Sequence, residues 1–442
     1  MSHDALIAHF TGASALILVA AHAAGWLARR LRQPYIVGQL AAGIALGPSL
    51  LGGLAPGAYA ALFPAAVGPA LTGLAQLALV VFLFGVGYEL DLKVLGDRAR
   101  TSVTVALASF TVPMAVGGGC ALLFGDQLHT LGMPRDLSPA AVVFAGVALS
   151  ITAVPVLTAI VRENGLSRSV PGVVAVSAAG VLDVIGWTVL AGAMLDSGGG
   201  APGLGWPWRV ALAVAFVTVM GCAARPVLRR LLWRTRLEPS LRLALLLGFA
   251  LASAWVTHSL GLHVIFGALL AGVVTPREDD GTLDPDLLRP LHDVGSLLLP
   301  FFFVVSGQAV TVGGLGATGW VALLVVTVLA VVTKVGSGTV AARLGGLGRH
   351  DARTVGVLLS ARGLTELIAL EAGRQAGLLS GPLYTVLVLM ALATTLLTQP
   401  LLRLTERLAA HDRAAAPPPP RRRPDEAAAT AAARLGDQRR PG

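Results

Sequence analysis

The chain has 442 residues, of which 55% are hydrophobic and only 13% are charged. Soluble domains carry roughly a quarter charged residues, and a single soluble core cannot bury this much apolar surface. The formal net charge of +9 comes mostly from arginines scattered through short loops, so no nucleic-acid partner is expected. This composition excludes an ordinary soluble enzyme and predicts an all-α polytopic membrane protein.

About thirteen apolar segments follow one another along the chain, and most are long enough to cross a bilayer as a helix of about 20 residues. The first segment lacks a basic leader and a cleavage-like site, so it is expected to be a membrane helix and not a removed signal. The segments are residues 5–28, 34–54, 69–90, 101–124, 139–161, 168–195, 208–224, 241–259, 262–275, 290–309, 317–344, 352–374 and 382–408.

The arginines in the loops indicate the orientation of these helices. Alternate loops on one side hold most of them, including Arg29 and Arg162, whereas the loops on the other side hold Arg135, Arg209 and Arg374. Such a bias is typical of positively charged cytoplasmic loops. It predicts a multi-pass membrane protein with the N-terminus outside and the C-terminus cytoplasmic. The arginine-rich, alanine-rich composition suggests a bacterium, so the expected location is a bacterial inner (plasma) membrane.

The chain is expected to divide at the end of the last apolar segment. Residues 1–410 form the transmembrane domain in this interpretation. Residues 411–442 are rich in alanine, proline and arginine, and this composition is typical of a disordered tail. The tail is expected to be cytoplasmic and too short for a folded regulatory domain.

Two apolar segments contain residues that interrupt a membrane helix. Pro155 lies inside segment 139–161, where it removes a backbone hydrogen bond and clashes with the preceding turn. Gly363 lies near the middle of segment 352–374, next to a charged residue. These segments are seven apart and therefore cross the membrane in opposite directions, as in transporters built from inverted repeats. The alternative is that two unrelated kinks coincide by chance.

Ionisable residues deep in a membrane are rare because each costs about 2.5–3.5 kcal/mol to insert. Asp183 lies at the centre of segment 168–195, with Gly180 and Gly186 three residues to either side. The glycines are expected to let a neighbouring backbone approach closely. A carboxylate there can hold a proton or a monovalent cation but not easily both, which is the minimal chemistry of cation/proton exchange. The alternative is that Asp183 joins helices through a salt bridge with a buried cation.

Lys334, Arg362 and Glu366 are the other deep ionisable residues. Lys334 can act as a proton carrier, because a buried lysine loses its proton readily, or as a fixed counter-charge. Arg362 cannot lose its proton and is expected to be structural, pairing with Glu366 one turn away. These three residues are predicted to compensate charge at the site.

The segment around Pro155 also offers oxygen ligands for a cation. The hydroxyls of Ser150 and Thr152, and backbone carbonyls freed by the interruption, are hard ligands that suit Na⁺ or K⁺. The sequence has no phosphate-binding loop, dinucleotide fingerprint, nucleophile elbow or metal-ligand spacing. No enzymatic activity, no cofactor and no metal other than the transported cation are therefore expected.

Several short motifs in order resemble one family of membrane carriers. They include PYIVG at 34–38, GYELD at 87–91, TAVPV at 152–156, LPFFF at 299–303 and RGLTEL at 362–367. Together, over residues 34–400, they resemble the monovalent cation:proton antiporter-2 family, which includes Kef-type and NapA-type carriers. The last two motifs are most similar to the plant cation/proton exchangers and an actinobacterial branch.

This resemblance implies a homodimer of thirteen-helix subunits in membrane lipid, with an elevator-like domain that carries K⁺ or Na⁺ against H⁺ by alternating access. Asp183 matches the essential carboxylate of the family, and Lys334 matches its usual lysine. Leu182 departs from the family pattern, because an aspartate or asparagine usually precedes the carboxylate. With one acid, exchange near 1:1 is expected. The alternatives are a K⁺ efflux channel on the same scaffold, an intramembrane enzyme or a transport-inactive homologue.

Overall fold

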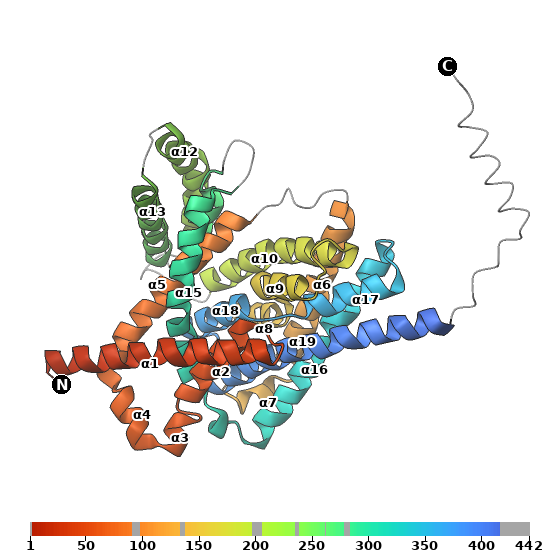
Figure 1. Ribbon diagram of the computed structural model, residues 1–442, viewed down its shortest axis with the longest axis horizontal. Helices are drawn as coiled ribbons and strands as arrows, with labels where there is room; N and C mark the ends of the chain where they lie inside the picture. The colour runs from red at the N-terminus through yellow and green to blue at the C-terminus, as the bar shows by residue number, and fades with distance from the viewer. Residues whose placement is uncertain are drawn as a thin grey trace, which may run out of the picture. The chain divides into compact units, whose positions relative to one another are not determined.

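The computed structural model describes residues 2–90, 98–132, 138–196, 206–234, 238–260, 262–277 and 283–415. It divides into two compact units, Met1–Leu402 and Arg403–Gly442. The second unit is described only over the end of the last helix, so most of the predicted tail, residues 411–442, lies outside the described residues. Most of the helices below are labelled in Figure 1.

The described residues form helices and connecting segments and contain no strand. In chain order, the helices are α1 (His3–Arg30), α2 (Tyr35–Leu46), α3 (Leu51–Leu54), α4 (Pro56–Leu62), η1 (Ala65–Val67), α5 (Gly68–Glu89), α6 (Ala99–Leu123), α7 (Gly125–His129), α8 (Pro139–Ser150), α9 (Val154–Glu163), α10 (Val170–Asp196), α11 (Trp206–Val219), η3 (Met220–Ala224), α12 (Arg225–Arg234), α13 (Pro239–Ser259), α14 (Val264–Val274), α15 (Pro285–Gln308), η4 (Val312–Gly314), α16 (Gly316–Leu344), α17 (Arg349–Leu359), α18 (Leu364–Gln375) and α19 (Gly381–Ala415).

The helices confirm the predicted membrane-spanning pattern. Within the described residues, eleven helical stretches are long and apolar enough to cross a bilayer. The two predicted segments that are missing from these eleven are helical as well. Segment 262–275 is the short apolar helix α14, and segment 352–374 is divided between α17 and α18. The chain is thus an all-α polytopic protein.

The long helices pack as two bundles. The panel bundle consists of α1, α2, α5, α13, α14 and α15, whose contacts are mainly with one another. The crossed-helix bundle consists of α6, α8, α9, α10, α16, α17 and α18, together with α19, which bonds to the segment before α18. Close crossings in the panel depend on glycine: a Cβ on Gly43 of α2 would collide with the carbonyl oxygen of Phe303 on α15.

Both predicted interruptions are present, and they contact each other. The extended residues 151–153 separate α8 from α9, and residues 360–363 separate α17 from α18. The main-chain nitrogen of Ala153 donates to the carbonyl oxygen of Ala361 at 3.2 Å. Pro155 lies in the first turn of α9 rather than in the extended stretch. Proline suits that position because its missing N–H would have had no helical partner.

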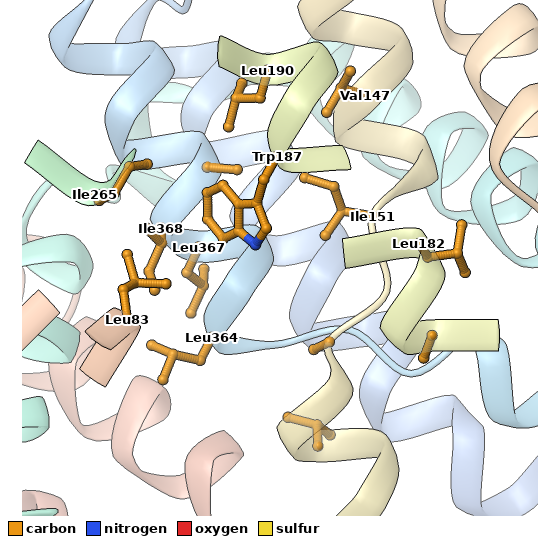
Figure 2. Close-up of a cluster of buried hydrophobic side chains, with 14 of the residues drawn as sticks. Leu83, Val147, Ile151, Leu182, Trp187, Leu190, Ile265, Leu364, Leu367 and Ile368 are labelled. Atoms are coloured by element: carbon orange, nitrogen blue, oxygen red, sulfur yellow. The ribbon is translucent and has the colours of Figure 1, made fainter. Parts of the chain in front are cut away.

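Aliphatic side chains join the two bundles around Trp187 of α10. Figure 2 shows the indole among side chains of α5, α14 and α18, including Leu83, Ile265 and Leu367. The Trp187 ring also meets the Phe266 ring of α14 edge-on, with centroids 6.2 Å apart. This apolar contact covers one side of α10 and leaves its other side to the polar site.

Candidate functional site

Asp183 lies in the middle of α10 at the inner end of a cavity. Its side chain is only 4% exposed, and its Oδ2 atom has no hydrogen-bond partner in the described part of the chain. The cavity has a volume of about 460 Å³ and is also lined by Glu89, Arg162 and His292. Glu89 ends α5 and Arg162 lies in the last turn of α9, so the cavity opens at that end of the helices. The carboxylate is therefore buried but accessible from one side.

Two titratable side chains meet at the mouth of the cavity. Nε2 of His292 on α15 lies 2.6 Å from Oε1 of Glu89, and both side chains are exposed. Because the pair is exposed, it contributes little to stability. It does place an acidic oxygen at the entrance, in agreement with the position of Glu89 at a helix end.

The two glycines beside Asp183 do not act as predicted. A Cβ on Gly180 would meet no atom within 4 Å, and a Cβ on Gly186 would make only ordinary contacts of 3.6 and 3.8 Å. The expectation that they allow a close backbone approach is wrong. Gly180 instead lines the cavity, where the missing side chain keeps the wall open beside Asp183.

Lys334 of α16 is fully buried and bonds to the backbone at the interrupted helix. Its Nζ donates to the carbonyl oxygen of Ser109 at 2.9 Å and to that of Ser150 over a short distance. Neither Lys334 nor Arg362 forms an ion pair with Asp183 within the described ranges. The alternative in which Asp183 joins helices through a salt bridge is thus not seen in this structure.

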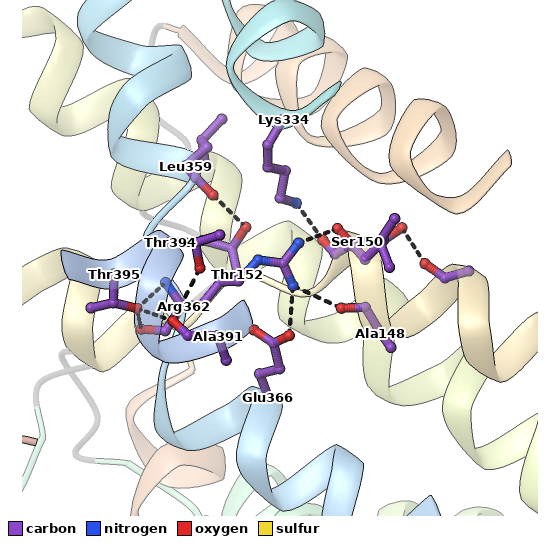
Figure 3. Close-up of polar contacts among 12 residues, drawn as sticks. Ala148, Ser150, Thr152, Lys334, Leu359, Arg362, Glu366, Ala391, Thr394 and Thr395 are labelled. Carbon is purple, nitrogen blue, oxygen red and sulfur yellow. Dashed lines mark hydrogen bonds and ion pairs between the residues drawn. The ribbon is translucent and has the colours of Figure 1, made fainter. Parts of the chain in front are cut away.

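Arg362 and Glu366 form a fully buried pair at the same interruption (Figure 3). Arg362 Nη1 lies 2.7 Å from Glu366 Oε1, as the i,i+4 spacing predicts. The guanidinium also donates to the carbonyl oxygens of Ala148 and Leu149 at 2.7 and 2.5 Å. Those carbonyls belong to the last turn of α8 and have no helical partner, because the helix ends there. A cation at a helix C-terminus also complements the helix dipole.

Ser150 and Thr152 lie apart from the cavity. The Ser150 hydroxyl donates to the carbonyl oxygens of Phe110 and Gly146, at 3.0 and 2.8 Å. Thr152 Oγ1 donates to the carbonyl oxygen of Leu359 at 3.0 Å, across to α17. Both side chains are buried, and neither lines the cavity that reaches Asp183. In this conformation the structure does not group them with the carboxylate.

The side-chain hydroxyls that do line the cavity are those of Thr158 on α9 and Ser177 on α10. Neither residue is predicted as part of the site from its sequence pattern. A signal was present, since Thr158 is one turn after Pro155 and Ser177 is less than two turns before Asp183. Both positions look like ordinary small polar residues of a membrane helix until the cavity is known.

Leu182, which departs from the family pattern, is 2% exposed and belongs to the hydrophobic cluster drawn in Figure 2. An acid or amide at this position would need a buried partner. In this chain the position contributes apolar packing, and Asp183 is the single carboxylate on the described length of α10 that faces the cavity.

A family model and individual relatives both relate this chain to cation/proton exchangers. A model of the family described as sodium/hydrogen exchanger, transmembrane, matches residues 17–404. The Na(+)/H(+) antiporter NhaS4 of Synechocystis sp. is 32% identical over 397 residues, which cover 87% of this chain and 94% of the relative. The Cation/H(+) antiporter 19 of Arabidopsis thaliana is 35% identical over 395 residues, covering 88% of this chain and 48% of the relative. The chain thus spans about half the length of the plant relatives it matches.

A solved structure shares the fold. The sodium proton antiporter MjNhaP1 from Methanocaldococcus jannaschii superimposes with a TM-score of 0.66, covering 91% of this chain and 99% of that one. The sequence identity is 14%, so this likeness concerns the fold alone. The polytopic arrangement of helices described above is therefore one that a known antiporter adopts.

Proposed function

We propose, on the premise that this chain belongs to the transmembrane sodium/hydrogen exchanger family, that it exchanges a monovalent cation, Na⁺ or K⁺, for H⁺ by alternating access. One observation carries the proposal: Asp183 is a buried carboxylate with an unpartnered oxygen at the inner end of a cavity open to one side. A buried acid without a protein counter-ion needs a proton or a cation from solution. Competition of the two for one carboxylate couples their movements.

The neighbouring buried cations support this chemistry without taking part in the exchange. Lys334 and Arg362 donate to carbonyls at the end of α8, and Glu366 balances Arg362. In the proposal the charges of these three residues stay the same while Asp183 alternates between binding a proton and binding a cation. Ser150 and Thr152, predicted as ion ligands, fix the interruption in this conformation. One acid that exchanges one proton for one cation gives a ratio near 1:1.

The loop arginines assign a side to the open cavity. Arg162 lies at its mouth, and the arginine bias places the loop after Arg162 in the cytoplasm. In this proposal the protein lies in a bacterial plasma membrane with its N-terminus outside, and the cavity opens toward the cytoplasm. Movement of the crossed-helix bundle against the panel bundle would expose Asp183 to the other side. A homodimer surrounded by lipid is part of the same proposal.

The test is a transport assay in proteoliposomes with an imposed pH gradient. Na⁺, K⁺, Rb⁺ and Li⁺ are added in turn, and collapse of the gradient reports cation-coupled proton movement. We expect the wild type to respond and Asp183→Asn to be inactive. Asp293→Asn removes an exposed carboxylate of α15 and is the matched control. Cation flux that moves no protons would indicate a K⁺ channel, and no response to any cation would indicate an inactive homologue.

A further inference from the structure

Ser177 is one of several buried hydroxyls without a hydrogen-bond partner in the described residues, and among them it is the one that lines the cavity leading to Asp183. Its side chain is 8% exposed, yet its Oγ atom has no hydrogen-bond partner in the described residues. Serine and threonine in helices normally donate to a carbonyl of the preceding turn. Thr188 on the same helix does so: its Oγ1 donates to the carbonyl oxygen of Val184 at 2.7 Å. Within the part of the chain that the structure describes, Ser177 is therefore a buried polar group without a protein partner.

Ser177 lies on the wall of the cavity that leads to Asp183. It also lines an adjoining hollow of about 390 Å³, and Thr158 lines both spaces. Since α10 begins on the side of the cavity mouth, Ser177 lies about 9 Å nearer to the entrance than Asp183, measured along the helix. Gly180 lies between the two and leaves the wall open.

Thr158 provides a second oxygen on the facing helix. Its hydroxyl donates to the carbonyl oxygen of Pro155 at 3.0 Å, so the proton is engaged while the oxygen lone pairs remain available. Two neutral hydroxyl oxygens with water between them suit a weakly held alkali cation. They offer no fixed negative charge, so a cation would bind there only in transit.

We propose that Ser177, together with Thr158, forms a second cation site in the cavity, where the entering Na⁺ or K⁺ loses part of its water before it reaches Asp183. This inference rests on the proposed exchange function and deepens it. Ser177 is then a specificity-determining residue, because the free energy of removing water differs among the alkali cations. A proton reaching Asp183 through water needs no such site, so the cation side of the exchange depends on Ser177 and the proton side does not.

The experiment compares Ser177→Ala with Ser102→Ala in the proteoliposome assay. Ser102 on α6 is 1% exposed, its Oγ is also unpartnered within the described chain, and it does not line the cavity. We expect Ser177→Ala to raise the KM for the preferred cation several-fold, to change the ranking of Na⁺, K⁺, Rb⁺ and Li⁺, and to leave the maximal rate nearly unchanged. Ser177→Thr retains the oxygen and should keep the ranking. Ser102→Ala should match the wild type.

A labelling experiment covers the case in which Ser177→Ala folds poorly. Ser177→Cys is made with both native cysteines, Cys120 and Cys222, replaced by alanine. A water-soluble thiol reagent should modify the new cysteine, and Na⁺ or K⁺ should slow the modification.

The inference is overturned if no cation slows the labelling, or if Ser177→Ala has the KM and ranking of Ser102→Ala. In that case exchange by the wild type and its loss in Asp183→Asn would leave the proposed function intact. A wild type without exchange would remove the proposed function itself, and the inference with it.

Discussion

The main-chain nitrogen of Ala153 donates to the carbonyl oxygen of Ala361 at 3.2 Å, so the two interrupted helices are bonded to each other at their breaks. Thr152 Oγ1 adds a second bond, to the carbonyl oxygen of Leu359. Two helix C-termini and two N-termini therefore meet in the middle of the bundle. Lys334 and Arg362 bond to the backbone at the C-terminal end of α8, where the helix dipole is negative.

The bond across the breaks predicts a stability effect of Thr152→Val. Valine has nearly the same shape but leaves the buried carbonyl oxygen of Leu359 without this donor, at a cost of about 1–3 kcal/mol. We expect a clear drop in the Tm of the purified protein in detergent. Thr218→Val is the control, because Thr218 is exposed on α11 and donates only within its own helix. Equal Tm values for the two variants would contradict the role assigned to Thr152.

The buried pair at the second break predicts strong coupling between two substitutions. Arg362→Met leaves Glu366 buried without its cation, and breaking a buried pair in this way costs about 3–5 kcal/mol. Adding Glu366→Gln removes the stranded charge, so the double variant should be more stable than Arg362→Met alone. Unfolding of the four forms in a double-mutant cycle measures the coupling.

Arg374→Gln serves as the comparison for this cycle. Arg374 pairs with Glu371 on the same helix, but Arg374 is 37% exposed and Gln375 Nε2 also donates to Glu371, at 2.8 Å. Glu371 therefore keeps a partner when Arg374 is replaced, and the loss should cost less than that of Arg362. Independent, additive effects of Arg362→Met and Glu366→Gln would contradict the pairing at the break.

Much of this fold can be predicted from the sequence, because an apolar chain can cross a membrane in only a few kinds of secondary structure. Every backbone group must be satisfied within the protein, so apolar runs of sufficient length become helices. The same rule located the interruptions, since Pro155 and Gly363 are poor helix residues at membrane depth. The buried pair of Arg362 and Glu366 followed from helical spacing.

The details of the site depend on contacts between segments far apart in the sequence. Ser150 and Thr152 were predicted as ion ligands, but neither lines the cavity that reaches Asp183, and their hydroxyls donate to carbonyls of α6, α8 and α17. Gly180 looked like a packing residue, but it faces open space. Ser177 had no distinguishing pattern. The sequence shows which side chains are polar. Which of them remain without a hydrogen-bond partner depends on the helices that pack against them, and these come from distant parts of the chain.

The contacts of Lys334 lead to a prediction about how the exchange rate responds to membrane potential. Lys334 Nζ is held by the carbonyls of Ser109 and Ser150, so we expect it to act as a fixed counter-charge. Only Asp183 then carries a proton, and each 1:1 cycle moves no net charge. Imposing a potential across proteoliposomes should then leave the exchange rate unchanged. Lys334→Gln keeps hydrogen-bond donors and should retain a 1:1 ratio with a lower Tm. A rate that follows the potential, with a changed ratio in Lys334→Gln, would identify Lys334 as a proton carrier.

Two contacts far from the cavity mouth are expected to influence the equilibrium between the state that is open beside Arg162 and the state that is open to the other side. The Tyr384 hydroxyl of α19 donates to the carbonyl oxygen of Ser306 on α15 at 3.3 Å, and Gln375 Oε1 of α18 lies 3.1 Å from Nε2 of His263 before α14. Both contacts join the crossed-helix bundle to the panel bundle, so movement of one against the other must break them. They favour the conformation in which the mouth beside Arg162 is open.

Tyr384→Phe should therefore shift the protein toward the opposite state. Loss of about 1 kcal/mol changes a two-state population about fivefold, and the apparent cation affinity from the mouth side falls with the fraction that remains open there. We expect KM measured from that side to rise by up to this factor and labelling of Ser177→Cys to slow in parallel. Tyr59→Phe on α4 is the control, since the Tyr59 hydroxyl has no hydrogen bond among the described residues. An unchanged KM together with unchanged labelling in Tyr384→Phe would show that this contact does not hold the mouth open.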